Sequence, residues 1–263
     1  MPDIQETAIH EVRQFKDGIF SRLDKEIIRE ISLEIILNSQ KIAVIACSGR
    51  HAEELAVGFL RSEGLLCSQD EIEKIEIADG EHRVHVKTLN PVPLILSSHK
   101  TIASSGARGT GAGHGLSRQP IREGQSIRIN PEQVLGMMDD FLSMASLHDS
   151  TGGTHAAALA KGNAEIIAVR EDIGRHNTID MLGGYALLGG IDLSDKMIVR
   201  TGRISSEIVH KVWRLGIPIV ISISVPTTMA IELACEAGVT IIGSVRGGKF
   251  IIYTHPERII AGY

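Results

Sequence analysis

The sequence predicts an α/β protein with a strand-rich N-terminal part and a C-terminal part built from alternating strands and helices. In the first part, short β-branched runs are separated by turn residues, a pattern typical of antiparallel hairpins. In the second part, strand-like runs alternate with segments whose apolar residues recur at helical spacing, which favours a partly parallel sheet covered by helices. We therefore expect a strand-rich subdomain over residues 1–126, ending in a glycine-rich loop, and an α/β subdomain over residues 127–263.

The composition suits such a fold and limits the partners. Of the 263 residues, 43% are hydrophobic but only 3% are aromatic, so the core must rest on aliphatic side chains. The formal net charge of −5 argues against a general affinity for nucleic acid or anionic membranes. No apolar run approaches the ~18 residues that a membrane span requires, and the polar first residues do not form a secretory signal. We expect a cytoplasmic protein that binds neither nucleic acid nor membrane.

Two hairpins and one helix are predicted before the glycine-rich loop. The hairpins are expected over residues 28–47, turning at Asn38-Ser39-Gln40, and over residues 71–88, turning at Asp79-Gly80. Residues 51–64 carry acidic residues in their first turn and an apolar stripe, which predicts a helix that ends near Gly64.

The C-terminal part begins with a strong helix signal. Asn130 is a suitable N-cap, Pro131 is a suitable first residue, and Gln133 completes a capping box. Strands are then expected over residues 154–160, 164–171, 197–202, 217–223 and 239–245, with helices after residue 177 and over residues 204–216 and 227–238. In such folds, ligands usually bind where a strand turns into the following helix.

Three turns of the C-terminal part are candidate anion sites. Arg203 and Ser205 belong to the turn that opens one helix, Thr227 belongs to the turn that opens the next, and residues 246–249 join the last two strands. Free N–H groups at a helix start, hydroxyl donors and an arginine together form a phosphate site. The alternative is plain capping, because Ser, Thr and Pro begin most helices. Taken together, the three turns favour a phosphorylated ligand.

The segment REDIGRHNTID, residues 170–180, is dense in charge and includes Arg175 and His176. Its groups either bind a polar ligand and transfer protons, or form an ion-pair network that holds a strand to a helix. Nearby, His155 is similar to the histidine of the H-x-E element in zinc deaminases. However, Ala157 stands where the glutamate is required, and no P-C-x-x-C follows. We expect no metal site, and His155 either faces a ligand or lies in the core.

The cysteines Cys47, Cys67 and Cys235 are far apart and form no CxxC pair, so the sequence predicts neither a disulfide framework nor a cysteine zinc site. Cys67 and Cys235 follow apolar neighbours, which predicts that both are small core residues. Cys47 precedes a Ser-Gly turn, and its exposure is left open.

Several long blocks resemble the formate dehydrogenase accessory protein family (FdhD/NarQ), from about residue 50 to residue 260. They are AEELAVGFLRSEGLL, TGGTHAAAL, REDIGRHNTID, TGRISSEIVHKVWRLGIPIVISISVPTT and YTHPERI. The resemblance implies a cytidine-deaminase-like α/β core. It also implies a homodimer that takes sulfur from a cysteine desulfurase to the molybdenum cofactor, in its bis-molybdopterin guanine dinucleotide form, before insertion into formate dehydrogenase.

The resemblance also assigns roles to residues. It implies that the family's cofactor-binding segment corresponds to Ser244, Val245, Arg246, Gly247, Gly248 and Lys249. The turn and motif residues above, His155, Arg175, His176, Arg203, Ser205 and Thr227, are further candidates for cofactor binding.

The glycine-rich loop, TIASSGARGTGAGHG at residues 101–115, departs from the family in one respect. The family loop reads close to S-C-G-x-C-G, and here Ser105 and Arg108 stand at the two cysteine positions. Only a thiolate attacks a donor persulfide and releases the sulfur again, so neither side chain is able to carry it.

Three hypotheses follow. In the first, the chain is an accessory protein that binds the cofactor but has lost or altered sulfur transfer. In the second, a displaced thiol such as Cys47 carries the sulfur. In the third, the chain is an enzyme acting on a nucleotide-like substrate on a deaminase-like scaffold, with Ser105 or His155 in the reaction and Arg108 holding an anion.

Overall fold

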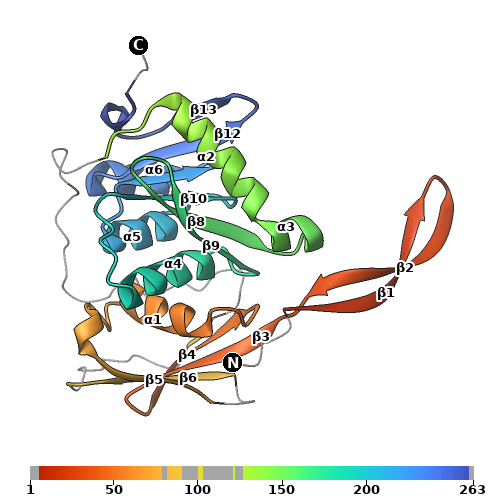
Figure 1. Ribbon diagram of the computed structural model, residues 1–263, viewed down its shortest axis with the longest axis horizontal. Coiled ribbons are helices and arrows are strands. Elements are labelled where there is room, and N and C mark those ends of the chain that lie inside the picture. The colour runs from red at the N-terminus through yellow and green to blue at the C-terminus, as the bar shows by residue number, and fades with distance from the viewer. Residues whose placement is uncertain (1–5, 79–81, 91–99, 103–120, 122–126, 261–263) are drawn as a thin grey trace.

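The computed structural model describes residues 6–78, 82–90, 100–102, 121 and 127–260. Within these ranges the chain forms a five-stranded sheet, a six-stranded sheet and a separate two-stranded ribbon. Figure 1 shows the two larger sheets at opposite ends of the body, with helices α1 and α4 between them. The expected mixed α/β class is confirmed.

The five-stranded sheet has the strand order β5-β6-β3-β4-β7. Its strands are β3 (Ile31–Leu37), β4 (Gln40–Cys47), β5 (Ile72–Ala78), β6 (Arg83–Thr88) and β7 (Lys100–Ile102). Both predicted hairpins are confirmed, because β3 pairs antiparallel with β4 and β5 pairs antiparallel with β6. Asn38 and Ser39 form the first turn at φ of 48° and 66°, whereas the predicted Asp79-Gly80 turn lies outside the described residues.

The six-stranded sheet has the strand order β13-β12-β11-β10-β8-β9. Its strands are β8 (His155–Lys161), β9 (Ile166–Asp172), β10 (Lys196–Arg200), β11 (Ile219–Ser222), β12 (Thr240–Arg246) and β13 (Lys249–Ile252). Strands β10, β11 and β12 are parallel to one another, and the remaining pairs are antiparallel. This result confirms the predicted partly parallel sheet.

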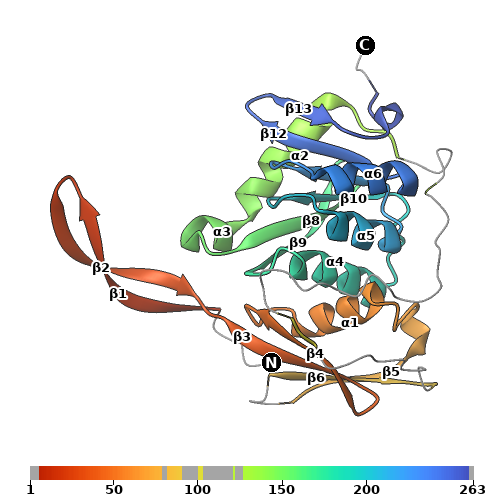
Figure 2. The ribbon, with the colours of Figure 1, turned by 180° about the vertical axis from the view of Figure 1, so that it is seen from behind.

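Helices cover both faces of the six-stranded sheet (Figures 1 and 2). They are α2 (Pro131–Met144) with the short α3 (Ser146–Thr151) on one side, and α4 (Asn177–Leu188), α5 (Ser206–Leu215) and α6 (Thr228–Ala237) on the other. Two short 3-10 helices, η1 (Gln69–Glu71) and η3 (Pro256–Arg258), complete the elements described. The predicted capping box begins α2, since Asn130 Oδ1 accepts from Gln133 N at 2.8 Å and Gln133 Oε1 accepts from Asn130 N at 3.0 Å.

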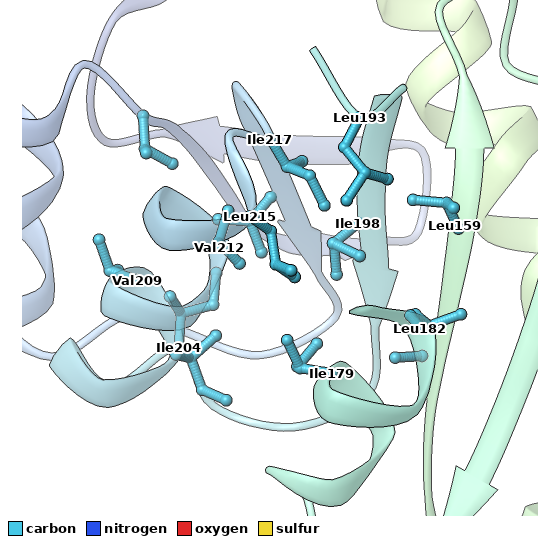
Figure 3. Close-up of a cluster of buried hydrophobic side chains, with 14 of the residues drawn as sticks. Leu159, Ile179, Leu182, Leu193, Ile198, Ile204, Val209, Val212, Leu215 and Ile217 are labelled. Atoms are coloured by element: carbon cyan, nitrogen blue, oxygen red, sulfur yellow. The ribbon is translucent and has the colours of Figure 1, made fainter. Parts of the chain in front are cut away.

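The apolar core of this part follows the alternation of the strands. Leu159 on β8 and Ile198 on β10 pack toward α4 and α5, where Figure 3 shows them among Leu182, Val212 and Leu215. The intervening β8 residues belong to a second cluster with α2. Because side chains in a strand alternate between faces, one strand supplies both cores.

Helix α1 (Ala52–Ser62) lies between the five-stranded sheet and α4. Leu55 and Phe59 of α1 pack on the sheet in one cluster that also includes Met181 and Leu187 of α4. The predicted end of this helix is confirmed, with Gly64 in the left-handed region at φ 75°. The proposed subdomain boundary at residues 126 and 127 stays a prediction.

One element was not predicted. Strands β1 (Thr7–Lys16) and β2 (Ile19–Ile28) form an antiparallel ribbon that extends away from the body (Figures 1 and 2). Neither face of the ribbon is continuously apolar, so the periodicity that reveals a half-buried strand is missing. Asp17-Gly18, at φ of 51° and 82°, is the hairpin signal that the sequence did contain.

Candidate functional site

The parallel strands β10, β11 and β12 end at one edge of the six-stranded sheet, where ligands bind in many α/β folds. Hydrogen bonds join the segments that follow the strands. Ser222 Oγ donates to Gly202 O at 2.9 Å, and Ser244 N donates to Ser224 O at 2.8 Å. The three predicted turns therefore lie along one edge, although the turn at 246–249 joins two strands and opens no helix.

Arg200, the last residue of β10, is the central feature of this edge. It is 1% exposed. Its Nη2 donates to Arg175 O at 3.4 Å, while Nε and Nη1 have no hydrogen-bond partner within the described part of the chain. Burial, followed by the nearby Arg175 charge, lowers the pKa of Arg200 to about 9. Leaving buried guanidinium donors unpaired is costly, so this group fits an anion that accepts from them.

Gly202 brings two further side chains to Arg200. A Cβ on Gly202 would lie 2.9 Å from Arg200 Nη2, 3.4 Å from His155 Nδ1 and 3.6 Å from Arg175 Cβ. The absence of a side chain at Gly202 therefore allows His155, Arg175 and Arg200 to meet.

Both histidines of this site are uncharged at neutral pH. Burial and the charges of Arg200 and Arg175 lower the pKa of His155. Burial, with Lys211 as the largest charge effect, also lowers the pKa of His176. Glu207 Oε2 lies 3.0 Å from His176 Nε2, but the Glu207 side chain is 40% exposed, so water partly screens its charge. The site thus concentrates arginines and neutral imidazoles.

Most charges of the 170–180 segment have structural partners. Arg170 Nε and Nη2 donate to the two carboxylate oxygens of Glu54 at 2.5 and 2.8 Å, which joins β9 to α1. Lys211 Nζ donates to both carboxylate oxygens of Asp180 at 2.5 and 2.6 Å, which joins α5 to α4. For these residues the ion-pair interpretation is correct.

Asp172 holds the loop that carries Arg175 and His176. Its carboxylate accepts from Ser48 N at 2.8 Å, Ser48 Oγ at 3.0 Å, Gly174 N at 2.8 Å and Asn177 Nδ2 at 2.6 Å. Burial raises the pKa of Asp172, and these hydrogen bonds oppose that shift. Asp172 therefore shapes the site, and the arginine and histidine on its loop face Arg200.

The remaining predicted turn residues divide into two groups. Ser205 Oγ is buried and has no hydrogen-bond partner within the described residues, so its hydroxyl is able to bond to a ligand. Thr227 caps α6, because its hydroxyl accepts from Ala230 N at 3.3 Å, and the capping interpretation is correct there. Arg203 is exposed beside them.

The segment 244–249 is a bulged hairpin at the same edge. Ser244 has a φ of 56°, and Gly247 and Gly248, at 60° and 71°, form the two-residue turn between β12 and β13. The side chain of Val245 is 1% exposed and belongs to the α2 core, so only its backbone faces the turn. Arg246 and Lys249 are exposed and occupy opposite positions.

The cysteine predictions are wrong for two of the three residues. Cys67 and Cys235, expected in the core, are exposed, whereas Cys47 is buried. Cys235 lies on the outer face of α6, opposite the buried Ala230 and Ala234, so its apolar neighbours pack inward without it. Burial, followed by the Asp172 charge, raises the pKa of Cys47 to about 12. Cys47 is therefore not a reactive thiolate.

Ser105 and Arg108, the predicted positions of the family's cysteines, lie outside the described residues. Among the residues that are described, no group of three His, Cys, Asp or Glu side chains is arranged to hold a metal ion. The longest of the described helices, α2, has 14 residues, and none of them is long and apolar enough to span a bilayer.

The architecture and the site together define an α/β protein with a buried arginine at the edge where its parallel strands end. Residues 28–260 match the FdhD/NarQ family, so the chain belongs to that family. The chain is 38% identical to the sulfur carrier protein FdhD of Bacillus subtilis (strain 168), over 96% of this chain and 97% of the relative. It is 37% identical to the protein of the same name from Staphylococcus haemolyticus (strain JCSC1435), over 94% and 95%.

A solved structure shares the fold. The crystal structure of a formate dehydrogenase accessory protein from Desulfotalea psychrophila matches with a TM-score of 0.81 at 23% identity. The match covers 97% of this chain and all of that one.

Proposed function

We propose that this protein is a sulfur-carrier-type accessory protein for a formate dehydrogenase, and that it binds the molybdenum cofactor in its bis-molybdopterin guanine dinucleotide form. This proposal rests mainly on the buried Arg200 guanidinium, whose Nε and Nη1 lack hydrogen-bond partners within the described residues. It lies at the sheet edge from which the segment 244–249 extends. The names of the Bacillus and Staphylococcus relatives support the sulfur-carrier role, and the Desulfotalea psychrophila structure supports the accessory role.

The residues present fit the anionic groups of that cofactor. Arg200 and Arg175 supply charge, Ser205 supplies a hydroxyl, and His155 and His176 are neutral groups that accept or donate one hydrogen bond without adding charge. The exposed Arg246 and Lys249 extend the positive charge along the edge. When bound, the cofactor supplies the metal that receives the sulfur. We further propose that the six-stranded sheet with its helices is a cytidine-deaminase-like scaffold.

Sulfur transfer by this chain is limited by the cysteines that it has. Ser105 and Arg108 are unable to carry sulfane sulfur, and the burial of Cys47 excludes it as the displaced thiol under native conditions. Cys67 and Cys235 are the described thiols that a cysteine desulfurase is able to reach. We therefore propose cofactor binding as the retained activity, with formate dehydrogenase and a cysteine desulfurase as partners and a homodimer as the assembly.

Calorimetric titration with GDP, which carries the nucleotide part of the cofactor, tests the proposal. We expect saturable binding that weakens with added salt, because the ligand is held by its phosphates. AMP is the matched control, since it has fewer phosphates and a different base, and we expect it to bind at least ~10-fold more weakly. An absence of saturable GDP binding at millimolar concentration would contradict cofactor binding.

A further inference from the structure

The N-terminal arm, which we define as β1, β2 and their turn (Thr7–Ile28), holds none of the residues proposed to bind the cofactor. Figures 1 and 2 show it extending from the body as a two-stranded ribbon. Such a ribbon is at best marginally stable in water by itself. Five of the twelve exposed large apolar side chains among the described residues lie on it: Ile9, Phe15, Ile19, Phe20 and Ile27. Exposed apolar surface of this kind is typical of a binding site.

The end of the arm carries an aromatic pair. Phe15 and Phe20 are directly opposite in the ribbon, with ring centroids 4.9 Å apart, and they are 62% and 71% exposed. The chain has only five phenylalanines, and these two lie one residue pair from the Asp17-Gly18 turn that ends the arm. Aromatic side chains, phenylalanine included, are enriched in protein interfaces relative to the rest of the surface.

Two bands of like charge follow the phenylalanines on the same face. Arg13 is directly opposite Arg22, and Glu11 is directly opposite Asp24. These pairs share the phenylalanine face because residues two apart in a strand point the same way. Like charges directly opposite each other destabilise a ribbon. Opposite charges from outside the strand pair would therefore stabilise the ribbon.

The arm itself supplies only part of that compensation. Arg22 Nη1 lies 3.3 Å from Glu11 Oε1, and both side chains are more than 60% exposed. Arg13 and Asp24 have no hydrogen bond or ion pair to any residue that the structure describes. One cation and one anion of the bands are thus left for a partner.

We propose that this face of the arm binds the same face of a second copy of the chain, with the two arms antiparallel. The basic band of each arm then lies over the acidic band of the other, because the two bands are equidistant from a twofold axis at the level of Val12 and Leu23. The same symmetry places Phe15 of one arm at the level of Ile9 of the other. This inference rests on the proposed homodimer and supplies its interface.

Reversing the bands separately tests the arrangement. Arg13→Glu with Arg22→Glu gives an arm with two acidic bands, and Glu11→Arg with Asp24→Arg gives an arm with two basic bands. We expect light scattering and sedimentation to show a dimer for the wild type. The dimer of each reversed variant alone should have a dissociation constant about 100-fold higher or more than that of the wild type. The reason is that bands of like charge then face each other. An equimolar mixture of the two variants should form a heterodimer.

The opposite face of the arm offers a matched control. Lys16→Glu with Lys25→Glu makes the same change in net charge away from the phenylalanine face, and we expect it to remain dimeric. All these side chains are on an exposed ribbon, so the circular dichroism spectrum of each variant should be unchanged.

The outcomes separate the proposals. A monomeric wild type overturns both the homodimer and the arm interface. If the wild type is a dimer and the Arg13→Glu/Arg22→Glu variant dimerises equally well, the arm interface is wrong and the homodimer stands. Failure of the two variants to form a heterodimer overturns the antiparallel arrangement. GDP binding measured on the same variants should be unaffected, so its absence counts only against cofactor binding.

Discussion

Gly58 of α1 and Gly184 of α4 form a backbone-to-backbone contact between the two halves of the fold. A Cβ on Gly58 would lie 1.7 Å from Asp180 O, and a Cβ on Gly184 would lie 1.9 Å from Glu54 O. Each glycine thus faces the backbone of the other helix, and neither position has room for a methyl group.

Gly58→Ala and Gly184→Ala should therefore each lower the free energy of unfolding by ~3 kcal/mol or more, because the two helices must move apart to admit the methyl group. Chemical denaturation measures this change. Gly136→Ala is the matched control, since Gly136 lies in α2 with nothing within 4 Å of its Cβ position. There we expect a gain of about 0.5–1 kcal/mol from helix propensity. Equal effects at Gly58 and Gly136 would contradict the close contact.

Arg200→Met should separate ligand binding from stability. The substitution removes a buried charge that lacks partners, so we expect the free energy of unfolding without ligand to stay constant or to rise by about 1 kcal/mol. GDP binding should weaken at least ~10-fold, because a hydrogen bond to a charged group contributes about 1.5–3 kcal/mol. Denaturation and calorimetry on one preparation measure both quantities.

Arg258 provides the control for Arg200, because it is equally buried at 1% exposure. Its Nη1 donates to Thr240 Oγ1 at 2.8 Å. Arg258→Met should therefore lower stability by about 1–3 kcal/mol and leave GDP binding intact. If the two variants behave alike, Arg200 has a structural role and the anion site is wrong.

Thiol labelling should distinguish the three cysteines. Cys67 and Cys235 are exposed and should react with a disulfide reagent in the native protein, whereas the buried Cys47 should react only after unfolding. The Cys67→Ser/Cys235→Ser variant isolates Cys47. Rapid native labelling of that variant, or a persulfide on Cys47 after incubation with a cysteine desulfurase, would restore the displaced-thiol hypothesis.

The stability should fall as the pH drops below about 6.5. His176 has a lowered pKa in the folded state, so the unfolded chain binds its proton first. The stabilisation is complete above the unfolded pKa of about 6.5 and is lost as the pH falls toward the folded value. The loss per histidine reaches at most ~1.4 kcal/mol per pH unit. His176→Gln should flatten the dependence of stability on pH between 6.5 and 4.5, whereas His10→Gln, on the exposed arm, should leave it unchanged.

Elements with a clear periodicity were predictable, because one apolar face fixes both the element and its orientation. Ile208, Val212 and Leu215 recur at helical spacing in the sequence, and all three lie on the buried face of α5. The arm was missed for the same reason, since its phenylalanine face alternates apolar, basic and acidic pairs. A contact between the arms of two copies of the chain leaves no periodic pattern by which one sequence could reveal it.

The site was predicted only in part. His155, Arg175 and Ser205 were candidates from their motifs, and the fold brings them to one edge. Arg200 was read as part of an apolar strand, although an arginine within MIVRTG is itself a signal, because a charge is rarely fully buried without a purpose. Which charges of the 170–180 segment pair with α1 and α5 depends on tertiary contacts that spacing does not encode.

The Asp172 carboxylate has a mechanical consequence. Through Ser48 it joins the chain just after β4 to the loop of Arg175 and His176, and Asn177 Nδ2 adds a bond to Ala46 O at 2.9 Å. β4 also pairs with β7, whose last two residues are the first two of the glycine-rich sequence at 101–115. The strand at the start of the glycine-rich sequence and the edge that carries Arg200 are therefore connected through β4 and the Asp172 carboxylate. A substitution that removes this carboxylate should disturb both places at once.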